Sequence, residues 1–107
     1  MDAKIQKKIE ELQILEQSSQ GILAQKQPLQ SQLAEIENAV DEIAKTNSDY
    51  FKIIGQVMIK SSKEELKKEL SEKKSYLELR IKKFEEQENE INSKLEKIRN
   101  EITKELK

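Results

Sequence analysis

The one compact apolar stretch of this 107-residue chain is Tyr50-Phe51-Lys52-Ile53-Ile54-Gly55-Gln56-Val57-Met58-Ile59-Lys60. Its alternation is typical of two short β-strands, with Gly55 at the centre, where a turn or a close backbone contact would want no side chain. Counting alternate residues straight through this stretch puts four residues on one face, which is wholly apolar: Phe51, Ile53, Val57 and Ile59. A lone two-stranded hairpin is marginal in water, so we expect it to pair with hairpins of other chains. The alternative is that it packs over the end of its own helices.

Both flanks of this stretch carry a heptad pattern. Alternating steps of four and three residues from Met1 to Ile43, and again from Leu70 to Glu105, meet an apolar side chain at most positions. The polar exceptions are Lys8, Ser19, Lys26, Lys74, Glu88 and Glu105. A seam sustained over this many heptads predicts a left-handed coiled coil.

We expect one domain over residues 1–107, with a first helix over about 2–46, a β-hairpin over about 50–60 and a second helix over about 62–105. Ser62 and Glu65 form a capping-box pattern at the start of the second helix. Helices of equal length can fold back on each other, which brings both termini to the same far end. The predicted fold class is mainly α: a long antiparallel coiled-coil hairpin with one short β-hairpin at the bend.

Composition excludes several classes of function. Lys and Arg number 20 and Asp and Glu 21, so no basic excess favours nucleic acid, and no His or Cys can supply a metal ligand or a catalytic nucleophile. Neighbouring carboxylates such as Glu10 and Glu11 diverge on a helix, so we expect no enzyme and no cofactor. The chain lacks an apolar run long enough for a membrane and a secretory signal core at its start, and a cytoplasmic protein is expected.

The connector and its flanks resemble the beta-type subunits of the prefoldin family. The resemblance is carried by residues 50–55 and 57–64, by Ala24-Gln25-Lys26-Gln27 and by Leu77-Glu78-Leu79-Arg80. Alpha-type members carry a longer connector with two hairpins, whereas this chain has room for one, and its simple pattern fits an archaeal member. The resemblance implies a hexameric, ATP-independent chaperone of two alpha-type and four beta-type subunits. Their hairpins would join into β-barrels, and unfolded proteins would be held between the coiled-coil tips and passed to a chaperonin.

Two groups of residues are candidates for binding. The oligomerisation group is Tyr50, Phe51, Ile53, Ile54, Gly55, Val57, Met58 and Ile59. The group for contact with unfolded proteins is Met1, Ile5, Ile9, Ile14, Ile98, Ile102 and Leu106. Ile9, Ile14 and Leu106 fall outside the seams, and Met1 and Ile5 are expected to face Ile98 and Ile102, where pairing should fray. The alternative for this second group is that its members merely widen the seam.

The first helix contains two unusual residues, Gly21 and Pro28. Proline lacks an amide proton and crowds the preceding turn, so we expect a hinge over residues 19–28 that lets the arms open around clients. The alternative is a proline tolerated in a helix that bends little. The main alternative function is an architectural coiled-coil adaptor that binds a folded helical partner. An RNA-binding helical arm is the weakest alternative, because the arm has neither a basic stripe nor stacking aromatics.

Overall fold

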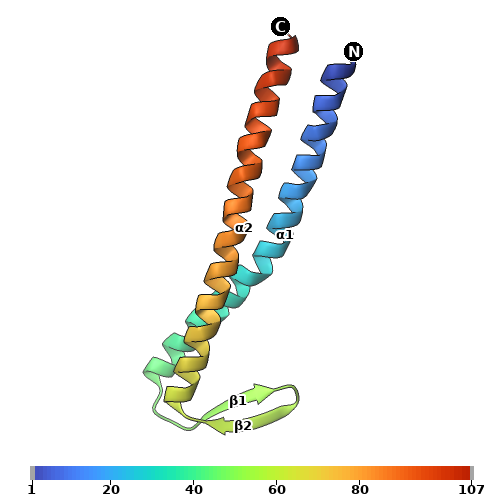
Figure 1. The fold of residues 1–107 in the computed structure, drawn as a ribbon. Coiled ribbons are helices and arrows are strands. Elements are labelled where there is room, and N and C mark those ends of the chain that lie inside the picture. The colour runs from blue at the N-terminus through green and yellow to red at the C-terminus, as the bar shows by residue number, and fades with distance from the viewer. Residues whose placement is uncertain (1, 107) are drawn as a thin grey trace. The chain divides into compact units, whose positions relative to one another are not determined.

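The computed structural model describes residues 2–106 (Figure 1). The elements follow one another as α1 (Ala3–Lys45), β1 (Tyr50–Ile54), β2 (Val57–Ser61) and α2 (Lys63–Leu106). Two long helices with a short antiparallel β-hairpin between them confirm the predicted fold class, and each element begins and ends close to the expected residue. Within this order the described residues form two compact units, residues 2–28 with 81–106 and residues 29–80. Each unit is described by itself below.

Polar side chains mark both ends of α1. The Asp2 carboxylate accepts a hydrogen bond of 3.2 Å from the Lys4 amide, which satisfies one of the free donors of the first turn. At the other end the Thr46 hydroxyl donates to the Glu42 carbonyl oxygen at 2.8 Å. Between these ends α1 continues through Gly21 and Pro28, so the helix is not interrupted there. Hinging at residues 19–28 stays a prediction.

Two serines make hydrogen bonds at the start of α2, and one of them, Ser62, caps the helix. The Glu65 amide donates to the Ser62 hydroxyl at 3.1 Å, which is the predicted N-cap bond. The Glu65 carboxylate accepts a hydrogen bond from the neighbouring Ser61 hydroxyl, also at 3.1 Å, where a capping box would have it turn to the Ser62 amide. Both serines therefore fix the point at which β2 passes into α2.

Every buried residue of the described chain lies on one of the two predicted heptad seams. In the unit of residues 2–28 and 81–106 these are Ile5, Ile22, Ile81 and Leu95; in residues 29–80 they are Leu29, Ile43 and Leu77. Each helix thus buries one apolar stripe, as a coiled coil does, and leaves its other faces in water.

The β-hairpin pairs Ile54 with Val57 and Ile53 with Met58, so only Gly55 and Gln56 form the turn. Gly55 has φ of 61°, and it is the one residue of the described chain with positive φ. A positive φ at the first turn position alone is the pattern of a type II′ turn, which favours glycine there.

The expected division of the hairpin into faces is wrong. Residues paired across an antiparallel ladder share a face, and the observed register puts Phe51, Ile53, Met58 and Lys60 on one side. The other side carries Tyr50, Lys52, Ile54, Val57, Ile59 and Ser61. Counting alternate residues straight through the centre failed because the two turn residues exchange the faces on which odd and even positions lie.

Candidate functional site

The outer face of the hairpin, formed by Phe51, Ile53 and Met58, is apolar and open. Their side chains are 52%, 71% and 65% exposed, and Lys60 lies beside them opposite Phe51. Ile54 and Val57 next to the turn and Ile59 in β2 are also exposed. So much apolar surface in so few residues is what an interaction site displays.

The inner face of the hairpin is tied to the helices by polar contacts. The Tyr50 hydroxyl donates to the carbonyl oxygens of Ile43, at 3.2 Å, and of Thr46 at the end of α1. On the same face the Lys52 ammonium lies 2.7 Å from a carboxylate oxygen of Glu69 in α2. Hydrogen bonding between the two raises the pKa of Lys52 and lowers the pKa of Glu69. These bonds hold the base of the hairpin against the helices and leave the side of Phe51, Ile53 and Met58 open; on the inner side, Ile54, Val57 and Ile59 beyond these bonds are exposed as well.

The edges of the hairpin offer a second means of association. Within the described residues β1 and β2 form a sheet of two strands, each paired only with the other. The outward N–H and C=O groups of both strands are therefore available to a further strand. An apolar face together with two open edges suits association with other hairpins better than packing onto the chain's own helices.

The residues predicted to contact unfolded proteins fall into three environments. Ile14 and Leu106 are 62% and 65% exposed, whereas Ile5 is buried at 7%. Ile9 is half-buried beside the seam, and Ile98 and Ile102 are half-buried seam positions. Met1 lies outside the described residues. The exposed candidates are therefore Ile14 and Leu106, and Ile5 belongs to the core.

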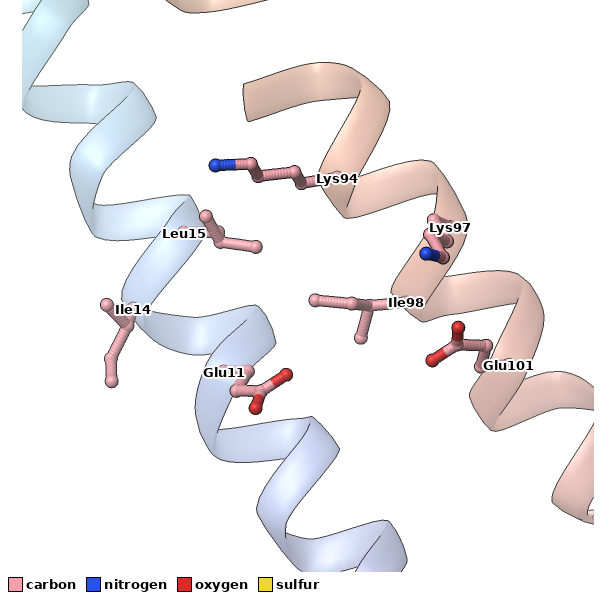
Figure 2. Close-up of a pocket in the computed structure, with 7 residues that line it drawn as sticks. All are labelled: Glu11, Ile14, Leu15, Lys94, Lys97, Ile98 and Glu101. Carbon is pink, nitrogen blue, oxygen red and sulfur yellow. The ribbon is translucent and has the colours of Figure 1, made fainter. Parts of the chain in front are cut away.

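One pairing expected near the chain ends is wrong. Figure 2 shows that Ile98 of α2 points toward Leu15 of α1, ten positions along the helix from Ile5. Ile14 lies beside Leu15 but turns to the outer side of α1. The two helices are thus offset by more than the equal arm lengths suggested.

A groove opens between the helices at this level. Its lining is Glu11, Ile14, Leu15, Lys94, Lys97, Ile98 and Glu101 (Figure 2). The floor is apolar, and its rim carries ammonium groups from α2 and carboxylates from both helices. Such a groove can take a short apolar segment whose backbone polar groups remain in contact with the charged rim.

Sequence reasoning missed the partners of the polar seam residues. The Lys8 ammonium lies 2.7 Å from a carboxylate oxygen of Glu105, and Lys26 lies 2.6 Å from Glu88. All four are seam positions, with both lysines on α1 and both glutamates on α2. Their opposite signs were visible in the sequence, but the match appears only once the offset between the helices is known.

The described residues hold no group of three or more His, Cys, Asp or Glu side chains that could bind a metal ion. Over the same residues, neither helix has a stretch both long and apolar enough to cross a membrane.

Comparison with known proteins identifies the family. The model of the prefoldin subunit family matches residues 6–107. The chain is 30% identical over 105 residues to prefoldin subunit beta of Sulfolobus acidocaldarius, covering 96% of this chain and 84% of the relative. It is 36% identical over 89 residues to the same subunit of Pyrobaculum arsenaticum, covering 81% and 72%.

The structural comparison agrees. The crystal structure of the prefoldin beta subunit from Thermococcus strain KS-1 superposes with a TM-score of 0.95 at 30% identity, over 99% of this chain and 95% of that one. The beta2 subunit from the same strain has a TM-score of 0.75 at 21% identity and so shows a shared fold. The chain therefore belongs to the prefoldin family, and it is of the archaeal beta-subunit type.

Proposed function

We propose that this chain is a beta-type subunit of an ATP-independent chaperone that holds unfolded proteins between its helical arms. Family membership gives the chaperone class, and the observation that carries the assembly is the open apolar face of Phe51, Ile53 and Met58. The assembly would be a cytoplasmic hexamer of two alpha-type and four beta-type subunits that passes its client to a chaperonin. In this assembly residues 1–107 act as one domain.

The hairpin is the proposed assembly surface. Its inner face is held by Tyr50 and Lys52, so the outer face has a fixed direction before any partner arrives. Preorganisation of this kind lowers the entropy cost of association. Backbone hydrogen bonds at the strand edges would supply affinity, and the apolar side chains would exclude water from the interface between subunits.

The proposed client surface lies along residues 2–28 and 81–106. Ile14 and Leu106 present apolar side chains directly to water, and Ile9 adds a half-buried one. Many weak apolar contacts of this kind suit a holder of unfolded chains, which share exposed apolar side chains but no common sequence. Ile98 and Ile102 would join when the helices separate.

The assembly is tested by native mass spectrometry of the chain mixed with an alpha-type subunit. The triple variant Phe51→Ser/Ile53→Ser/Met58→Ser should lose the hexamer while circular dichroism shows its helices intact. The matched control is Leu79→Ser, which removes an exposed apolar side chain of α2 outside the hairpin. If the triple variant still forms the hexamer, the hairpin is not the assembly surface, and the alternative that it packs on the chain's own helices is favoured.

The client surface is tested by light scattering of an aggregating, denatured model protein. Ile9→Ser/Ile14→Ser should weaken suppression of aggregation and leave the hexamer intact. Gln17→Ser changes an exposed polar residue of the same helix and should behave as wild type. Full suppression by the double variant would remove these isoleucines from the client surface. No suppression by the wild-type assembly would favour an architectural adaptor.

A further inference from the structure

We propose that the charged layers Lys8–Glu105 and Lys26–Glu88 set the register in which the two helical segments of residues 2–28 and 81–106 pair. This inference concerns the folding of the arm, and it holds whether or not the arm binds unfolded proteins.

The two pairs differ from ordinary surface ion pairs. The Lys26 and Glu88 side chains are only 14% and 20% exposed at a separation of 2.6 Å, and Lys8 and Glu105 are 19% and 25% exposed at 2.7 Å. In contrast, Arg99 and Glu16 meet at 3.3 Å with about half of each side chain in water. The contact with Lys8 also lowers the pKa of Glu105, and the pKa of Lys8 is raised in return.

The spacing of the pairs matches on both helices. Five alternating steps of four and three residues lead from Lys8 to Lys26, and five such steps also lead from Glu88 to Glu105. Consequently both layers close together only when the helices are aligned as observed. Leu15 and Ile98 meet in a layer between them, which is consistent with this alignment (Figure 2).

The apolar layers between the pairs select no register by themselves. On α1 the apolar seam positions are Leu12, Leu15 and Ile22, with the small uncharged Ser19 among them, and on α2 they are Ile91, Leu95, Ile98 and Ile102. Leucine and isoleucine are similar in volume, so a slip of one heptad would again bring aliphatic side chains together. Hydrophobic burial is non-directional and changes little in such a slip.

The same slip separates the charged side chains from their ion-pair partners. Moving α2 by seven residues in one direction places Lys26 against Leu95 and Glu105 against Leu15. Moving it in the other direction places Lys26 against Ile81 and Lys8 against Ile98. Either slip leaves a charged side chain in the seam without its partner, and an unpaired charge against an aliphatic side chain at a largely covered position is unfavourable. A polar layer that fixes register in this way is an established use of polar seam residues in coiled coils.

The test traps the register with disulfides, which is unambiguous because the chain has no cysteine. Leu15→Cys/Ile98→Cys reports the observed register, and Leu15→Cys/Ile91→Cys reports a slip of one heptad. Each reporter is oxidised within the full-length chain, and mass spectrometry measures the intramolecular disulfide. With the natural seam we expect the first reporter to form the intramolecular disulfide and the second to form only a trace of it.

The four charges are then replaced together by leucine, as Lys8→Leu/Lys26→Leu/Glu88→Leu/Glu105→Leu. We expect closure of the slipped reporter to rise at least tenfold, while circular dichroism still shows helix. A folded leucine seam in which the slipped reporter stays at its natural level would overturn the proposal.

A second set of variants keeps the seam charged, in case the leucine seam aggregates. Lys26→Glu places two carboxylates in one layer and should raise the ratio of slipped to observed register several-fold. Lys26→Glu/Glu88→Lys restores an ion pair and should return that ratio to its natural value. A ratio unchanged by the single reversal, or not restored by the double one, would equally overturn the proposal.

Discussion

Replacing Leu77 by alanine should destabilise the chain by about 2–3 kcal/mol, whereas the same replacement at Leu79 should change stability by less than about 0.5 kcal/mol. Leu77 is 4% exposed in the seam, and Leu79, two positions along α2, is 54% exposed. Core Leu→Ala changes cost roughly 2–5 kcal/mol, and the lower part of that range applies because a seam between two helices can be reached by water. Both variants gain the same small helix propensity, so the difference reports burial.

The assay is guanidinium unfolding of the isolated chain, followed by circular dichroism and extrapolated linearly to water. Measurements at two protein concentrations separate unfolding from dissociation, since only dissociation moves the midpoint with concentration. A loss of 2 kcal/mol corresponds to roughly a 30-fold fall in the ratio of folded to unfolded chain. Equal losses at Leu77 and Leu79 would refute the assignment of the seam and its inner face.

Three further outcomes are expected in the same unfolding assay. Gly21→Ala should stabilise the chain by up to about 1 kcal/mol, because an added Cβ meets nothing within 4 Å on the exposed helix face. Gly55→Ala should instead destabilise the hairpin by about 1–2 kcal/mol, since φ of 61° strains any residue with a Cβ; equal signs for the two glycines would contradict this. Ser62→Ala should cost about 1 kcal/mol through loss of the N-cap bond, and an unchanged midpoint would show that water replaces it. Because lysine partners lower the pKa of Glu69 and Glu105 below the ordinary 4.5, their ion pairs should stabilise the fold above about pH 4.5 and fail as the pH falls further. Glu69→Gln/Glu105→Gln should flatten this acid dependence, and a slope unchanged in that variant would assign it to other carboxylates.

The seam could be predicted from the sequence because a coiled coil is specified by one local period. Each buried residue, from Ile5 to Leu95, falls on the four-and-three alternation, and no distant contact is needed to find it. The ends of the helices followed from equally local chemistry, such as the hydroxyl of Ser62 before the charged start of α2.

The remaining features depend on how distant residues align. The faces of the hairpin are set by the length of its turn, and whether Gly55 alone or Gly55 with Gln56 makes the turn cannot be decided from alternation. The pairing of Lys26 with Glu88 depends on the offset between the helices, which equal arm lengths do not determine. The exposure of Ile14 relative to Ile5 was different, because Ile14 lies off the seam and Ile5 on it, which the local period already indicates.

Lys60 affects which surfaces can associate with the hairpin. Lys60 pairs with Phe51 across the ladder and shares the open apolar face, so any surface that closes over that face must offer its ammonium group a carboxylate or a path to water. Nonspecific apolar contact provides neither, so Lys60 disfavours aggregation through this face, in the way that lysines on the edge strands of natural sheets do. The one ammonium group on this face thus disfavours nonspecific apolar contact and favours a covering surface that carries a matching carboxylate.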